Sequence, residues 1–201
     1  MWDRSEAEMK LTLIRHGNTE ANEKGLYYGS TDLPLSAEGK RALERTASRF
    51  VFPSAQRYYT SGMLRSEQTF AILYGDIPHE PLYGLREMDF GSFEMRAYDE
   101  LKNDAAFLEW ISGDAETNIC PGGESGASVL MRSYREVEKL LDSCSDAVVI
   151  THGGVIGGLM AKFFPTYVGR YAYTPDPGFG VTITFDGHTP VYWNAEPGET
   201  V

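Results

Sequence analysis

The stretch "KLTLIRHGNTEAN" (residues 10–22) places charged and polar residues directly after a run that is typical of a buried strand. Residues 11–14 are apolar or β-branched and predict that strand. Arg15, His16 and Gly17 follow at once. A glycine is enough to end a strand, which needs neither a cation nor an imidazole at that point. The sequence therefore indicates that this strand end holds something.

The composition fits a single domain with a small insertion. At 201 residues, with 42% hydrophobic and 12% aromatic residues, the chain can bury a large core. Its start, "MWDRSEAEMK", is acidic and has no apolar run, unlike a secretory signal, and Met9 is a candidate internal start that would leave residues 1–8 as a loose leader. Cys120 and Cys144 have no metal-ligand spacing around them. Such thiols are typical of a reducing compartment, and we expect a cytoplasmic protein.

The charge of the chain restricts its partners. Its 18 basic and 29 acidic residues give a formal net charge of −11, which disfavours nucleic acids and anionic membranes as partners. The Gly-rich stretch "VVITHGGVIGGLMAKFF" (148–164) is interrupted by a histidine and a lysine. Its spacing changes from strand-like to helical, so it predicts a strand, a turn and a helix rather than a membrane span. A phosphate ester would also be repelled unless a few cations are concentrated at one place.

Strand-like and helical segments alternate along the chain. The sequence predicts strands over residues 10–14, 57–61 and 146–151, an edge segment over 77–84, helices from an N-cap at Ser36 to about Phe50, over 63–75 and 128–144 and after residue 152, and a hairpin over 180–194 that turns at 186–188. This alternation predicts an α/β fold, a three-layer sandwich with a mixed, mostly parallel central sheet flanked by helices. Residues 86–135 break the alternation, and we expect them to form a small inserted cap within one domain spanning residues 1–201.

Reactive side chains follow several of the predicted strands. In open α/β sheets, ligands bind beyond the carboxyl ends of the strands. The residues found there are Arg15 and His16 after the first strand, Arg65 one helical turn after the second, Arg86 and Glu87 after the edge segment, and His152 after strand 146–151. Two of these arginines, Arg15 and Arg65, are thus expected to converge on one crevice with the two histidines and Glu87, and that set suits a phosphoryl group.

Each residue type has a chemical use at such a site. Planar guanidinium groups grip phosphate oxygens bidentately, and helices that begin after Gly17 and Gly153 would add backbone N–H donors. A neutral imidazole can attack phosphorus, and a second imidazole can stabilise the transferring oxygens. Glu87 is the candidate acid for the departing alkoxide, because a neighbouring phosphate dianion favours a protonated carboxyl. We expect no metal and no other cofactor, since no cluster has metal-ligand spacing.

Five segments, in order, resemble the histidine phosphatase superfamily, which has the phosphoglycerate-mutase-like fold. "LIRHGNTEAN" resembles its R-H-G-x-T-x-x-N signature, and "TSGMLRSEQT" resembles its S-x-x-x-R-[AS]-x-Q-T segment. "LREMDFGSFE" resembles its L-x-E-x-x-F-G-x-[WF]-E segment, "PGGES" (121–125) a segment of its cap, and "VVITHGG" its second histidine. The resemblance covers residues 10 to about 158, and five ordered matches are far more specific than a lone Arg-His-Gly.

The resemblance implies a role for each matching residue. His16 would be the nucleophile that becomes phosphohistidine, and Glu87 would be the proton donor. The phosphoryl group would be held by Arg15, Arg65 and His152, with further substrate contacts from Gly17, Asn22, Tyr28, Gly29 and Gly153. If these matches are fortuitous, Arg65 would form a surface salt bridge with Glu67 or a neighbour, and Glu87 would be a solvated loop acid with Asp89 and Glu94 as rivals.

Departures from the family pattern bear on the reaction. Phosphatase branches often carry R-x-Q-G where residues 26–29 read Leu-Tyr-Tyr-Gly, and Met95 stands where a glycine is usual. The R-H-Y-G stretch of true mutases is absent, and only Arg96 and Lys102 lie near its place. We therefore expect a phosphomonoesterase acting on a small phosphorylated metabolite. A phosphoglycerate mutase and a non-catalytic phospholigand-binding protein are the alternatives, although pure binding needs no proton donor. The sequence indicates neither the leaving group nor the oligomeric state.

Overall fold

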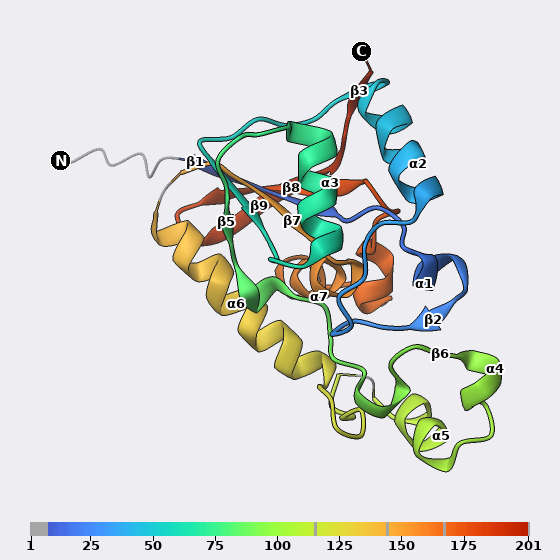
Figure 1. The fold of residues 1–201 in the computed structure, drawn as a ribbon. Helices are drawn as coiled ribbons and strands as arrows, with labels where there is room; N and C mark the ends of the chain where they lie inside the picture. The colour runs from blue at the N-terminus through green and yellow to red at the C-terminus, as the bar shows by residue number, and fades with distance from the viewer. Residues whose placement is uncertain (1–7, 115, 144, 167, 201) are drawn as a thin grey trace.

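The computed structural model describes residues 8–114, 116–143, 145–166 and 168–200, and its centre is a six-stranded sheet (Figure 1). The strand order is β5-β4-β7-β1-β8-β9. The strands are β1 (Glu8–Arg15), β4 (Arg57–Thr60), β5 (Glu80–Pro81), β7 (Ala147–Thr151), β8 (Gly180–Asp186) and β9 (Thr189–Glu196). The neighbours from β5 to β1 are parallel, whereas β8 is antiparallel to both β1 and β9. The predicted mixed, mostly parallel sheet is confirmed.

Helices cover both faces of this sheet, which explains the uninterrupted apolar runs of its central strands. Alternate residues of β1 and β7, such as Leu13 and Val149, pack with α6 (Gly126–Asp142) and α7 (Gly153–Phe163). The residues between them, Ile14, Val148 and Ile150, pack with Phe70 of α3 (Leu64–Tyr74), which itself contacts α2 (Ala37–Ala47). The sheet is therefore the middle layer of the predicted three-layer sandwich.

Most of the predicted element boundaries are confirmed. The Ser36 hydroxyl accepts the Gly39 N–H as N-cap of α2, and Gly75, with φ 70°, ends α3. The final hairpin turns at residues 187–188, as predicted. The helix predicted over 128–144 begins instead at Gly126, because Ser125 provides its N-cap.

Two other predictions, the end of α2 and the extent of the N-terminal leader, are wrong. Helix α2 ends at Ala47, and Phe50–Val51 forms β3, which pairs with β10 (Glu199–Thr200). That pairing partner is remote in sequence, so local spacing could not reveal it. Glu8 belongs to β1, where it pairs with Asp186, rather than to a loose leader. The rest of the predicted leader, residues 1–7, and Cys144 lie outside the described residues.

The segment predicted as a cap lies beside the sheet (Figure 1), and its buried side chains, such as Phe93 and Phe107, belong to the same apolar cluster as Leu13 and Val149. Its β6 (Arg96–Ala97) pairs with β2 (Leu26–Tyr27), which follows α1 (Glu20–Glu23). Aromatic rings pack edge to face around Tyr27, including Phe107 and Trp110 of α5 (Ala105–Ser112). The remaining elements are α4 (Tyr98–Leu101) and the 3₁₀ helices η1 (Tyr83–Leu85), η2 (Gly91–Phe93) and η3 (Gly169–Tyr173). The cap therefore packs against the segment that follows β1, through the β2–β6 pairing and the ring of Tyr27.

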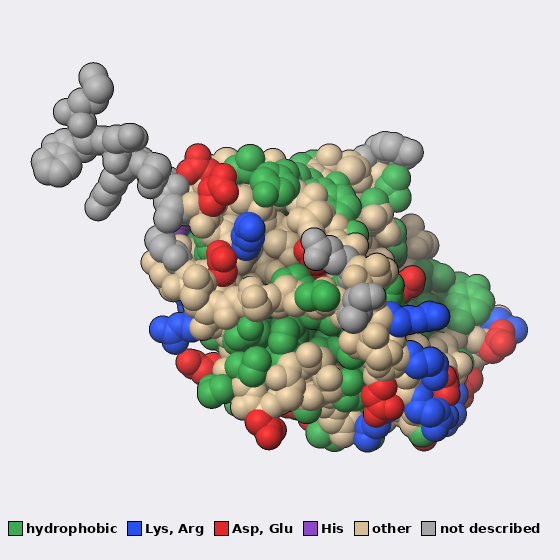
Figure 2. Space-filling model, turned by 90° about the horizontal axis from the view of Figure 1, so that it is seen from above, with side chains coloured by type: hydrophobic (Ala, Val, Ile, Leu, Met, Phe, Trp, Pro, Cys, Tyr) green, Lys and Arg blue, Asp and Glu red, His purple; other side chains and the backbone are tan. Residues whose placement is uncertain are grey.

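The sequence contains many charged residues and no long uninterrupted apolar run, and the surface and the helices of the structure reflect both features. Figure 2 shows acidic side chains interspersed among the basic ones that gather at one corner of the face seen from above. No helix in the described parts of the chain combines the length and the apolar character needed to cross a bilayer.

Candidate active site

The register of two neighbouring strands brings His16 and His152 together. Arg15 at the end of β1 is paired with Thr151 at the end of β7, and the His16 N–H donates to the Thr151 carbonyl at 2.9 Å. The next residue of each chain segment is therefore a histidine at the same sheet edge. The two rings lie edge to face with centroids 5.0 Å apart, and both side chains are buried. The convergence of the two histidines predicted from the sequence is present.

His16 is held as a neutral imidazole with one free nitrogen. Its Nδ1 lies 2.6 Å from the Gly17 carbonyl oxygen. Because a carbonyl can only accept, Nδ1 carries the hydrogen and Nε2 keeps its lone pair. Burial, followed by the charges of Arg65 and Arg15, lowers the pKa of His16 to about 3, although the bond to Gly17 acts in the opposite direction. The ring is thus prepared to act as a nucleophile through Nε2.

His152 is oriented by a residue that the sequence analysis did not single out. The Ser61 hydroxyl lies 2.8 Å from His152 Nε2 and 2.8 Å from the Ser66 hydroxyl. Nδ1 of His152 is buried and has no hydrogen-bond partner among the described residues. Burial, and then the charge of Arg65, lowers the pKa of His152 well below its usual value. Ser61 is the first serine of the S-x-x-x-R-[AS]-x-Q-T pattern that "TSGMLRSEQT" resembles. This match could have identified Ser61 as a site residue from the sequence.

Arg65 is a fully buried cation without an ion-pair partner in the described chain. Its two terminal nitrogens donate to the carbonyls of Gly29, at 2.8 Å, and Thr31, at 3.1 Å, while Nε is buried and unpaired. The predicted alternative, a surface salt bridge with Glu67 or a neighbour, is wrong, because Arg65 is buried and Glu67 pairs with His79 at 2.8 Å. A buried charge is costly unless it is compensated, so Arg65 is well suited to an anionic ligand.

Arg15 approaches the same place from the other side of the histidines. One terminal nitrogen donates to the Pro175 carbonyl at 2.9 Å, and Nε is buried without a partner in the described residues. A Cβ at Gly153 would lie 3.1 Å from that Nε, so glycine lets Arg15 reach the first turn of α7. The first N–H groups of a helix have no partner within the helix and favour anions. Arg15 and α7 together form a second anion-binding element.

Glu87 faces the N-terminus of α7. Its two carboxylate oxygens accept from the N–H of Met88, at 2.9 Å, and of Gly154, at 3.0 Å. A Cβ at Gly154 would lie 2.6 Å from Oε1, so this contact requires glycine. The residue before it, Arg86, is exposed and stacks on the Tyr83 ring at 4.7 Å. Glu87 therefore joins the site, and Arg86 does not.

The rival carboxylates are occupied with loop structure. Glu94 accepts from the N–H groups of residues 29–31 and from the Thr31 hydroxyl. Burial alone would raise the pKa of Glu94, but these bonds bring that pKa below its usual value. Asp89 accepts from the Ser30 hydroxyl and the Gly91 N–H. The hydrogen bonds of both carboxylates thus go to residues 29–31, 90 and 91, whereas Glu87 contacts the start of α7 beside the histidines.

Asn22 and Tyr28 form a small network beside Arg65. The Tyr28 hydroxyl donates to Asn22 Oδ1 at 2.7 Å, and the Thr19 N–H donates to the same oxygen at 3.0 Å. The Arg65 guanidinium lies over the buried Tyr28 ring, 5.0 Å from its centroid. With Oδ1 occupied, the Asn22 amide can present its N–H₂ group to a ligand.

Two of the predicted substrate-binding glycines have other contacts. A helix follows Gly17, as expected, but α1 begins only at Glu20, with Thr19 as its N-cap. The Gly17 N–H donates to the Thr69 hydroxyl at 3.0 Å. Gly29 donates its N–H to Glu94 and accepts from Arg65, and a Cβ there would lie 1.7 Å from the Met88 carbonyl oxygen. Both glycines permit close packing around the site.

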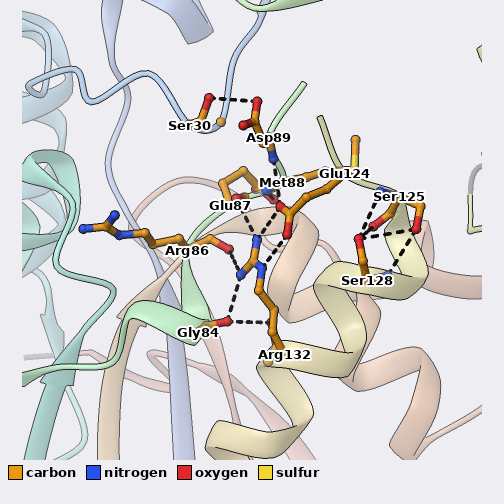
Figure 3. A network of polar contacts seen from close by, with 12 residues as sticks. Ser30, Gly84, Arg86, Glu87, Met88, Asp89, Glu124, Ser125, Ser128 and Arg132 are labelled. Carbon is orange, nitrogen blue, oxygen red and sulfur yellow. Dashed lines mark hydrogen bonds and ion pairs between the residues drawn. The ribbon is translucent and has the colours of Figure 1, made fainter. Parts of the chain in front are cut away.

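The complete arrangement concentrates positive charge within an acidic chain. Two guanidinium groups and the start of α7 surround two neutral imidazoles, and one carboxyl group lies at the edge, on the segment drawn in Figure 3. Within the described residues, no three His, Cys, Asp or Glu side chains are grouped so that they could hold a metal ion. The site can bind a tetrahedral anion, offer a nucleophile to its central atom, and supply a proton to a departing oxygen.

Known proteins resemble this chain over most of its length. Residues 11–191 match the model of the histidine phosphatase superfamily (branch 1). An adenosylcobalamin/alpha-ribazole phosphatase of Salmonella typhimurium is 31% identical over 160 residues, which are 77% of this chain and 79% of that protein. A protein named "probable phosphoglycerate mutase" from Cronobacter sakazakii is 28% identical over 172 residues, 81% of this chain and 79% of the other. The crystal structure of the alpha-ribazole phosphatase from Shigella flexneri has a TM-score of 0.81 at 26% identity and covers 91% of this chain and 94% of its own.

Proposed function

The chain belongs to the histidine phosphatase superfamily, and from this membership and the geometry of the site we propose that it is a phosphomonoesterase acting through a phosphohistidine intermediate. The observation that carries the proposal is His16: its Nδ1 hydrogen is held by the Gly17 carbonyl, and its Nε2 makes no hydrogen bond to the described residues. It lies beside the buried, uncompensated Arg65, whose charge lowers the pKa of His16. A pure anion-binding site needs no such nucleophile.

In the first step, the phosphoryl group is transferred to His16. Arg15, Arg65 and the N–H of Gly153 hold its oxygens, and the Nε2 lone pair of His16 attacks phosphorus in line. The Ser66 hydroxyl donates to the Met63 carbonyl, so the Ser61 hydroxyl donates to Ser66 and accepts the Nε2 hydrogen of His152, which orients this second imidazole beside the phosphoryl group. A new P–N bond forms as the P–O ester bond breaks. Glu87 gives its proton to the departing oxygen and is left as a carboxylate.

In the second step, water releases the phosphate. The Glu87 carboxylate accepts a proton from the water, whose oxygen attacks phosphorus. The P–N bond breaks, the electron pair returns to His16 Nε2, and inorganic phosphate leaves. Glu87 is protonated again, so the cycle is complete without a metal ion or another cofactor.

A phosphoglycerate mutase is the second candidate, because relatives named as such are 27–29% identical. A mutase must also bind the glycerate carboxylate, and this requires further cations. The two nearby cations are engaged within the chain: Arg96 pairs with Asp104 at 3.4 Å and Lys102 with Asp99 at 2.8 Å. These pairs favour the phosphatase. The proton donor position of Glu87 likewise disfavours a protein that only binds a phospholigand.

The substrate that we propose is a small phosphorylated metabolite. The names of the Salmonella and Shigella relatives make alpha-ribazole phosphate the first compound to test. We also propose a cytoplasmic location, which the free, buried thiol of Cys120 supports.

A panel of metabolite phosphates tests this function directly. Release of inorganic phosphate is measured for alpha-ribazole phosphate, sugar phosphates and 3-phosphoglycerate, the last with and without 2,3-bisphosphoglycerate. We expect phosphate release from at least one monoester. Interconversion of phosphoglycerates without net phosphate release would establish the mutase instead, and binding without turnover of any compound would establish the binding protein.

A further inference from the structure

Glu87 lies on a segment that has no regular secondary structure. Residues 86–90 connect η1 to η2 without helix or strand hydrogen bonds. The position of the Glu87 carboxyl therefore depends on whatever fixes this backbone. Figure 3 shows that a single side chain from α6, Arg132, reaches it.

Arg132 uses every N–H donor of its guanidinium group. Nη1 donates to the carbonyls of Gly84, at 2.8 Å, and Arg86, at 2.6 Å, and Nη2 donates to the carbonyl of Glu87 at 2.9 Å. The two remaining donors, on Nε and Nη2, bind the carboxylate of Glu124 at 2.9 and 2.8 Å. The planar guanidinium group of Arg132 thus binds three backbone carbonyls at or close to Glu87.

Glu124 fixes the other end of the same segment. Its Oε2 accepts the Asp89 N–H at 3.0 Å, and its own N–H donates to the Asp89 carbonyl at 2.9 Å. Glu124 belongs to the cap motif "PGGES", so the cap contacts the acid-bearing segment through this residue. The Arg132–Glu124 pair is only about one quarter exposed, which makes its hydrogen bonds less open to competition from water.

We propose that Arg132 and Glu124 are positioning residues that hold Glu87 where it can protonate the leaving oxygen, an inference that rests on the proposed function. Within the described residues, neither side chain hydrogen-bonds a phosphoryl-binding group; both bind the backbone of residues 84–89, and the charge of Arg132, which Arg132→Lys would keep, also lowers the pKa of His152. A displacement of about 1 Å in a reacting group can cost roughly 10²-fold in rate. The pair therefore matters most for substrates that depend on the proton.

The sharpest variant is Arg132→Lys. It keeps the charge and most of the side-chain length, but an ammonium has three donors and cannot form the planar fork. Glu124→Gln changes the partner end of the same pair. A matched control is Arg170→Lys, because Arg170 forms a 2.6 Å ion pair with Glu116 of the cap but makes no contact with residues 84–89.

The test compares kcat/KM on an alkyl phosphate and on p-nitrophenyl phosphate, whose phenolate leaves without a proton. Since kcat/KM reports the steps up to departure of the leaving group, it isolates the proton donation. We expect Arg132→Lys and Glu124→Gln to lose roughly tenfold more on the alkyl phosphate than on p-nitrophenyl phosphate. In the double variant Glu87→Gln/Arg132→Lys, the difference between the substrates should not exceed that of Glu87→Gln alone. Arg170→Lys should show no difference between them.

Equal losses on both substrates in a folded Arg132→Lys or Glu124→Gln protein would overturn the proposal. Circular dichroism identifies which variants are folded, and either of the two suffices, since each changes one end of the pair. If Glu87→Gln itself shows no difference between the substrates, the proton-donor role in the proposed function fails. If Glu87→Gln shows the difference and the folded positioning variant does not, only this inference fails.

Discussion

The two sides of the candidate site are built by different means. On the phosphoryl-binding side, the register of β1 and β7 brings His16 and His152 to one sheet edge. On the proton-donating side, Glu87 lies in an irregular segment that a guanidinium from α6 holds by its carbonyls. The first side therefore depends on the sheet, and the second on a few side-chain hydrogen bonds. We expect them to respond differently to substitution, because the hydrogen bonds of Arg132 can be removed without changing an apolar side chain of the core.

The largest effect is expected for the nucleophile on the sheet side. His16→Ala removes the only proposed phosphoryl acceptor, so kcat should fall by roughly 10⁴-fold or more on every substrate. The fold should persist, as measured by circular dichroism. His188→Ala, at a half-exposed position in the final turn, is the control and should retain activity. Substantial turnover by His16→Ala would show that His16 is not the phosphoryl acceptor and would contradict the proposed mechanism.

Arg65→Lys tests the anion-binding part of the same side. A lysine cannot reproduce the contacts of a planar guanidinium, so we expect kcat/KM to fall by about 10²-fold. The loss should be the same for an alkyl phosphate and for p-nitrophenyl phosphate, because the phosphoryl group is common to both. A loss confined to the alkyl phosphate would instead mean that Arg65 assists proton donation. It would contradict the assignment of Arg65 to the phosphoryl-binding side alone.

Glu87→Gln tests the proton-donating side. The amide keeps the size of the side chain but cannot give up a proton, so an alkyl phosphate should react roughly 10²-fold more slowly or worse. With p-nitrophenyl phosphate the loss should be much smaller. Asp89→Asn and Glu94→Gln should show no such dependence on the leaving group, since these carboxylates contact residues 29–31, 90 and 91 and Glu87 contacts the start of α7. Equal losses for Glu87→Gln on both substrates would mean that the acid lies elsewhere.

The smallest effect concerns stability. Because burial lowers the pKa of His16 to about 3, the native state does not take up a proton near pH 6 whereas the unfolded chain does. The free energy of unfolding should therefore decrease as the pH falls below about 6.5, by about 1 kcal/mol between pH 6.5 and 5.5 for this residue. Urea unfolding of wild type and His16→Asn would measure it, and the variant should lack this contribution. Identical pH dependence of the two proteins would contradict the buried, neutral state of His16.

The same contrast explains what the sequence could predict. His16, His152 and Arg65 follow strand ends, and spacing along the chain is enough to expect that parallel strands bring such positions together. The contacts of the glycines were harder to predict from the sequence. Gly17 looks like the start of a helix, but the structure uses its N–H for Thr69, which is remote in sequence.

The proton-donating side was predicted less completely for a physical reason. The motif around Glu87 indicated the acid, but nothing local shows that Arg132, on a helix 45 residues away, holds its backbone. Ser61 is similar, because its contact with His152 spans 91 residues. Likewise, the β3–β10 pairing that ends α2 early joins remote parts of the chain. Side-chain networks between distant segments leave no periodic signal in a sequence.

The central claim is that His16 carries the phosphoryl group during turnover, and trapping that intermediate tests it most directly. The protein is mixed with a phosphate-labelled substrate, quenched during the first turnover, digested and mapped. We expect the label on the peptide that contains His16, stable in base and labile in acid, and absent from His16→Ala. Label on a serine, an aspartate or another histidine, or active turnover without any labelled protein, would contradict the account.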